Sequence, residues 1–104
     1  MLAGKQKEAR AILDKIAPVM VSIESLEGVE EFSMLAVPIR EPLFVKKRFL
    51  EQAVAAATII MSSFDATELP EVVSLREVLD TIANAKKVIA LITGVLAAIA
   101  RAHR

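Results

Sequence analysis

Apolar positions recur at spacings of three and four residues through most of the chain, a period typical of amphipathic α-helices. The first such pattern covers residues 2–27 and predicts one buried face. The stripe on this face consists of Ala9, Ile12, Leu13, Ile16, Met20, Ile23 and Leu26. Pro18 lies inside the pattern, and because proline lacks a backbone donor, we expect a kink or a break near residues 14–17. Gly28 is expected to end the helix in the left-handed conformation that glycine tolerates.

Residues 29–41 carry a weaker pattern that contains two prolines. Glu30 and Glu31 suit the first turn of a short helix, where negative charge is favourable. Pro38 and Pro42 each favour extended backbone in the residue before them. We therefore predict one or two helical turns followed by an extended connector. A short strand is an alternative, although no second strand is evident to pair with it.

The second long helix is predicted to begin at Pro42 and to run to about Phe64. Proline suits a first helical position because its missing N–H is not needed there. The main apolar stripe of this helix consists of Leu43, Leu50, Ala53, Val54, Ala57, Ile60, Met61 and Phe64. Residues 65–73 follow as a connector that contains Pro70.

A third helix, over residues 74–103, has the clearest start signal in the chain. Ser74 and Glu77 match the capping box, in which each side chain satisfies a backbone N–H of the other residue. A heptad reading from Leu75 places apolar side chains at eight of its nine seam positions. These positions are Leu75, Val78, Ile82, Ala85, Ile89, Ile92, Leu96, Ile99 and His103.

The second half of this third helix is apolar on nearly every side. Between residues 88 and 100 only Thr93 and Gly94 are not plainly apolar. Small residues recur at four-residue spacing around Gly94, which predicts a close helix crossing with Ala53 and Ala57 as the facing surface. Each Ile or Leu left exposed in this segment forgoes about 1.5–3 kcal/mol of burial. The segment therefore needs more cover than two neighbouring helices provide.

Together these patterns predict a single all-α domain over residues 1–104, an antiparallel bundle of three long helices plus a short helical element. The third helix would be about 43 Å long, whereas a compact globule of this chain length is about 33 Å across. We therefore expect a homo-oligomer, with a symmetric dimer the commonest solution, or a complex with another helical protein. The expected interface residues are Val88, Ile89, Leu91, Ile92, Gly94, Val95, Leu96 and Ile99.

The composition and the net charge are consistent with a protein that self-associates. Of the 104 residues, 55% are hydrophobic, and 13 basic side chains balance 13 acidic ones. This neutrality argues against a protein that coats nucleic acid, and it leaves little charge to oppose self-association. The apolar run over residues 88–100 is shorter than the roughly 20 residues of a bilayer span, and the N-terminus lacks the apolar segment of a signal peptide. We expect a cytoplasmic protein without a membrane span.

Residue types that carry chemistry are scarce. The chain has no Cys, Tyr or Trp, and His103 is its one histidine, which argues against Ser–His and Cys–His nucleophiles. No phosphate-binding glycine motif is present. Two acidic clusters lack the spacing of a calcium-binding loop, and we interpret them as solvated. They consist of Glu24, Glu27, Glu30 and Glu31, and of Asp65, Glu68 and Glu71. No catalytic residue, cofactor or metal site is predicted.

The favoured function is a non-enzymatic oligomerisation or scaffold subunit that self-associates through its third helix. An alternative is a nucleic-acid-associated accessory protein that binds the phosphate backbone through basic helix faces. The possible phosphate contacts are Lys46, Lys47, Arg48, Lys86 and Lys87. A third hypothesis is a carrier of apolar ligands, with a cavity in the bundle interior.

Overall fold

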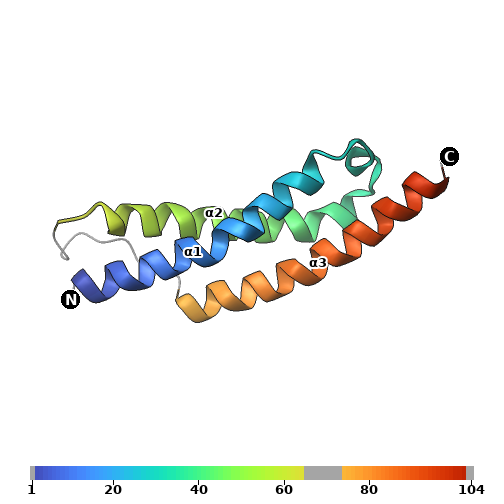
Figure 1. The fold of residues 1–104 in the computed structure, drawn as a ribbon. Coiled ribbons are helices and arrows are strands. Elements are labelled where there is room, and N and C mark those ends of the chain that lie inside the picture. The colour runs from blue at the N-terminus through green and yellow to red at the C-terminus, as the bar shows by residue number, and fades with distance from the viewer. Residues whose placement is uncertain (1, 65–73, 103–104) are drawn as a thin grey trace.

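The computed structural model describes residues 2–64 and 74–102, and over these two ranges it contains helices and no strand. The elements are α1 (Leu2–Glu27), the 3-10 helix η1 (Glu30–Met34), α2 (Val37–Met61) and α3 (Leu75–Ala102). α1 and α3 run in the same direction and α2 runs in the opposite one (Figure 1). The result is an elongated bundle, 57 Å long and about 20 Å across. The all-α fold predicted from the sequence is confirmed.

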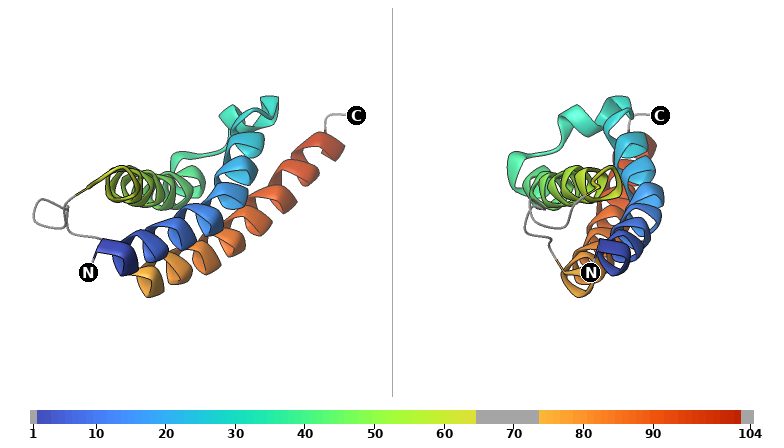
Figure 2. Two further views of the ribbon diagram at one scale, coloured as in Figure 1. Left: turned by 60° about the vertical axis from the view of Figure 1, so that its left-hand side comes forward. Right: turned by 90° about the vertical axis from the view of Figure 1, so that its left-hand side faces the viewer.

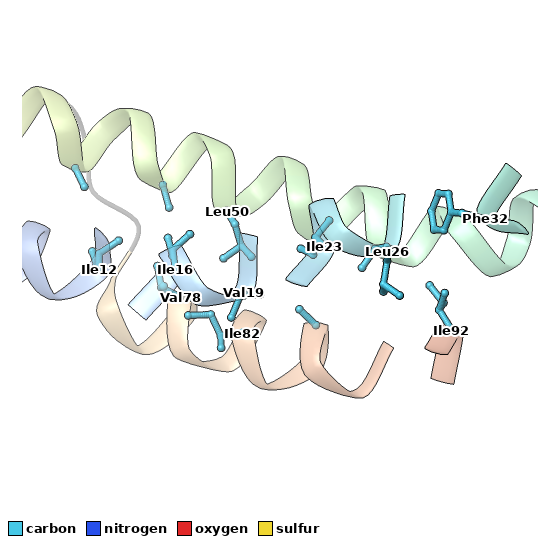
Figure 3. Packing of buried hydrophobic residues seen from close by; sticks show 14 of the residues in the cluster. Ile12, Ile16, Val19, Ile23, Leu26, Phe32, Leu50, Val78, Ile82 and Ile92 are labelled. Atoms are coloured by element: carbon cyan, nitrogen blue, oxygen red, sulfur yellow. The ribbon is translucent and has the colours of Figure 1, made fainter. Parts of the chain in front are cut away.

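The core lies along the line where the three long helices meet, and all three contribute side chains to it (Figure 3). On α1 the predicted stripe is confirmed, except that Leu13 and Met20 are only half-buried. Val19, which was not in that stripe, is buried. The difference arises because α3 packs against the side of α1 that carries Val19. Leu13 and Met20 lie on another side of α1, where they line a groove between α1 and α2.

The heptad seam of α3 packs inside its own chain. Val78, Ile82, Ala85, Ile92 and Leu96 are all buried against the other helices, and Figure 3 labels Val78, Ile82 and Ile92 in the close view of the core. An apolar seam of this kind packs against a neighbouring helix, which can belong to the same chain or to another chain. The seam is therefore used within the subunit, and the side of α3 that remains exposed lies elsewhere around the helix.

The structure tests the expectations about Pro18 and Gly28. α1 is not broken at Pro18, and its ribbon continues through the proline and bends in its second half (Figure 2). The helix ends at Glu27, immediately before Gly28 as predicted, but the left-handed conformation predicted for Gly28 is wrong, since no described glycine has a positive φ. The N–H of Val29 instead bonds to the carbonyl of Leu26, three residues back. This tighter turn leads the chain directly into η1.

The predicted start of the second helix is also wrong. After η1 only Leu35 and Ala36 are extended, and α2 begins at Val37, five residues before Pro42. Pro38 occupies the first turn, where its missing donor costs nothing, and Pro42 lies inside the helix. Pro42 removes one hydrogen bond, to the carbonyl four residues back. The helix ends at Met61 rather than near Phe64, whose side chain is 99% exposed instead of buried.

Two polar side chains near the start of α1 hold the ends of the other helices. The Gln6 side-chain amide donates to the carbonyls of Ile60, 3.3 Å away, and of Ser63, 3.1 Å away, at the end of α2. The Glu8 carboxylate accepts from the backbone N–H of Leu75, the first residue of α3. Ser74 also accepts from the N–H of Glu77, as the capping box predicts. α1 therefore contacts both helix ends that flank residues 65–73.

Candidate interaction surface

The eight predicted interface residues of α3 fall into three groups. Ile92 and Leu96 are buried in the core of their own chain. Val88, Ile89, Val95 and Ile99 are half-buried along the flanks of the helix. Leu91, which is 66% exposed, and Gly94 lie on the side that faces away from the bundle. The chain alone thus covers one side of the apolar segment and leaves the other side open.

We call this open side the outer face of α3. It consists of five exposed residues, which share one side of the helix at its period of 3.6 residues. They are Leu91, Gly94, Ala97, Ala98 and, at the edge next to the groove between α1 and α3, Ala90. Lys87 and Arg101 lie on the same side before and after them, and no charged residue stands between these two cations. The uncharged stretch between the two cations is about 21 Å long, from the rise of 1.5 Å per residue.

The one polar side chain in this stretch is turned inward on its own helix. Thr93 donates its hydroxyl hydrogen to the carbonyl of Ile89, with an oxygen–oxygen distance of 2.7 Å. A hydroxyl bonded in this way offers its donor to no partner outside the helix. The stretch is therefore less polar than its sequence indicates.

Gly94 has open space beside it. A Cβ atom built on Gly94 would meet no atom within 4 Å. The close crossing predicted between Gly94 and Ala53 and Ala57 does not occur inside the subunit, because both alanines are buried in the core on the other side of α3. The expectation assumed that the small-residue ridge faces the bundle, whereas the larger side chains of the heptad seam occupy that position.

Pairs of helices also form grooves on the surface. A groove of about 700 Å³ lies between α1 and α2 and is lined by Leu13, Met20 and Val54, with Asp14 and Glu51 among the lining residues. Smaller grooves of about 200 Å³ each lie between α1 and α3 and between α2 and α3. The α1/α2 groove is open to the surface, unlike the interior cavity that the hypothesis of an apolar-ligand carrier requires.

Sequence reasoning missed this groove. It assigned Leu13, Met20 and Val54 to buried stripes, although all three are half-buried. The available signal was the width of the stripe on α1, where Ile12 and Leu13 are consecutive. Two consecutive residues point about 100° apart on a helix, so a single neighbour does not bury both.

The five basic side chains proposed as phosphate contacts do not share one surface. Lys46 lines the groove between α2 and α3, whereas Lys86 lines the groove between α1 and α3. Lys47 is paired with Glu27 of α1 at 2.6 Å, and this hydrogen bond raises the pKa of Lys47. Arg48 and Lys87 are exposed. These five side chains therefore form no continuous basic surface on one subunit, and the binding of nucleic acid stays a prediction.

The described residues contain no group of three or more His, Cys, Asp or Glu side chains placed to hold a metal ion. Asp65, Glu68, Glu71 and His103 lie outside the described residues. By length and composition alone, α3 could cross a membrane, and only 22% of its most apolar window is buried in the subunit. A core helix of a soluble protein passes the same test of length and composition, but here most of that window is not covered.

No family model, no curated protein and no solved structure matches this chain.

Proposed function

We propose that this protein is a non-enzymatic assembly subunit that self-associates through the outer face of α3. The observation that carries the proposal is the outer face of α3, which stays exposed and uncharged between Lys87 and Arg101 although the other side of the same helix packs in the core. Full burial of a leucine such as Leu91 contributes about 1.5–3 kcal/mol. The alanines and Gly94 contribute less area each, but they let a second helix approach closely.

The polar groups of the described residues support a structural role. Hydroxyl groups of Ser22, Ser25, Thr58 and Thr93 all donate to carbonyls four residues back on their own helices. The shifted pKa of Lys47 has a structural cause, its ion pair with Glu27 between α1 and α2. The hydroxyl groups bond within their own helices and Lys47 bonds between α1 and α2, so these groups are not directed into a common pocket. We propose a second copy of this chain, rather than a different helical protein, as the first partner.

The proposal is tested by the solution mass of the wild type and of two leucine variants. Light scattering after size exclusion should give the wild type a mass of at least two 11.3 kDa subunits at micromolar concentration. Leu91→Glu should give one subunit, because it places a carboxylate in the uncharged stretch. Leu79→Glu is the matched control, since Leu79 is also exposed on α3 but lies one residue before Asp80 and outside the outer face.

A wild type that has the mass of one subunit at these concentrations contradicts the proposal. So does a wild type that floats with phosphatidylcholine vesicles as a single subunit, because the outer face would then meet lipid rather than a second helix. Equal masses for Leu79→Glu and Leu91→Glu, both below that of the wild type, would remove the assignment to the outer face.

A further inference from the structure

The groove between α1 and α2 has the form of a vacant helix position. α3 already fills the equivalent position on the other side of this helix pair, so that α1, α2 and α3 surround one core. Leu13 and Met20 on α1 and Val54 on α2 present apolar surface to the groove, and all three are half-buried. Ala17 and Ala55 line it as well, and both are exposed. Small side chains on the walls leave room for a helix backbone, as in the packing of a fourth helix onto a bundle.

The charges at this groove are complementary to those that border the outer face of α3. The charged side chains that line the groove are Asp14 and Glu51, both carboxylates and both exposed. The outer face is bordered by Lys87 and Arg101, and Lys87 lies one helical turn before Leu91. A helix that places Leu91 in the groove therefore carries a cation toward the two carboxylates. Such complementarity selects the partner and its orientation more than it adds affinity.

We propose that the α1/α2 groove receives the outer face of α3 from a second copy of this chain. Leu91 of one subunit lies among Leu13, Met20 and Val54 of the next, and the small residues around Gly94 lie against Ala17 and Ala55. The inference rests on the proposed function and deepens it, because it names the surface to which α3 binds.

The positions of the two surfaces determine the symmetry of the assembly. The groove is formed by α1 and α2 alone, whereas Leu91 and Gly94 lie on the side of α3 opposite its buried residues, so we expect that one neighbour does not occupy the two surfaces together. Each subunit therefore binds one neighbour through α3 and another through its groove. Contacts of this head-to-tail kind close into a ring or continue as a filament, whereas a symmetric dimer pairs the same surface on both subunits.

Mixing two defective variants tests this arrangement. Leu91→Glu damages the outer face and keeps the groove, whereas Ala17→Glu damages the groove and keeps the outer face. Each variant alone should have the mass of one subunit, and an equimolar mixture should give a species of two subunits that does not grow further. Ala55→Glu, on the other wall of the groove, should behave as Ala17→Glu does. Val21→Glu, at a 63% exposed position of α1 that does not line the groove, is the control and should assemble like the wild type.

Circular dichroism on each variant confirms that the helices are intact before masses are compared. If Ala17→Glu and Ala55→Glu both assemble like the wild type while Leu91→Glu does not, the groove is excluded and self-association through α3 remains. If the mixture, like each variant alone, keeps the mass of one subunit, the intact groove of one variant does not bind the intact outer face of the other, and the inference is overturned. If the wild type itself has the mass of one subunit, the proposed function fails first.

Discussion

The carboxylate of Glu8 accepts a hydrogen bond from the backbone N–H of Leu75, with an oxygen–nitrogen distance of 3.2 Å across 67 positions of the sequence. Leu75 is the first residue of α3, where unpaired N–H groups and the helix dipole favour a negative charge. A residue of α1 thus supplies a cap that local sequence does not provide. This contact and those of Gln6 with the end of α2 join the start of α1 to both other long helices.

Glu8→Ala should destabilise the protein by about 0.5–1 kcal/mol, the range for a charge or cap at a helix N-terminus. The loss follows because Leu75 N–H exchanges a charged acceptor for water. Urea unfolding followed by circular dichroism measures it, with Lys7→Ala as a control on the neighbouring exposed position. Equal stability of Glu8→Ala and the wild type would show that water replaces the cap without cost.

Val19 and Val21 form a matched pair on α1, two residues apart and 4% and 63% exposed. Val19→Ala should lower the free energy of unfolding by about 2 kcal/mol, because it removes two buried methyl groups and leaves a small cavity in the core. Val21→Ala, which empties no buried space, should change it by less than about 0.5 kcal/mol. Urea titrations of the two variants at one protein concentration give the comparison, and similar losses in both would contradict the orientation of α1.

Lys47 and Glu27 should make stability depend on alkaline pH. Their hydrogen bond raises the pKa of Lys47 above its ordinary value of 10.5, so the folded protein holds this proton more tightly than the unfolded chain does. The stabilisation is complete below the unfolded pKa and is lost as the pH rises through the folded pKa. Lys47→Met should therefore cost about 0.5–1 kcal/mol at pH 7, and the difference from the wild type should shrink above pH 10.

Unfolding free energies of Lys47→Met and the wild type at several pH values between 7 and 11.5 provide the measurement. Lys15→Met, at an exposed position of α1, is the control for the loss of one positive charge. A difference that stays constant across the whole range would mean that packing of the Lys47 side chain, rather than its charge, is the source of the stability.

Gly94→Ala should stabilise an isolated subunit by about 0.5–1 kcal/mol, because glycine loses more backbone freedom on folding than alanine does. A Cβ at this position meets no neighbour within 4 Å, so no clash opposes the gain. The comparison is made in the Leu91→Glu background, where we expect single subunits and assembly does not contribute to stability. A loss of stability on this substitution would indicate a neighbour close to Gly94 within the subunit.

Local sequence determined most of the secondary structure. The period of the apolar residues and the stop at Gly28 predicted α1 as Leu2–Glu27, and Ser74 with Glu77 marked the start of α3. These signals succeed because they act within one or two turns of the same helix. The start of α2 was predicted five residues late, because Pro38 and Pro42 carry the same signal and only the fold decides which one lies in the first turn.

The tertiary structure determined which side of each helix is buried. α3 carries apolar residues on nearly all sides, so its sequence alone did not distinguish the face that packs in the core, with Ile92 and Leu96, from the face left exposed, with Leu91 and Gly94. The contact between Glu8 and Leu75 and the α1/α2 groove were equally hidden, since each joins residues far apart in the chain. Periodicity states which residues share a side of a helix, whereas packing against the other two helices determines which side is buried.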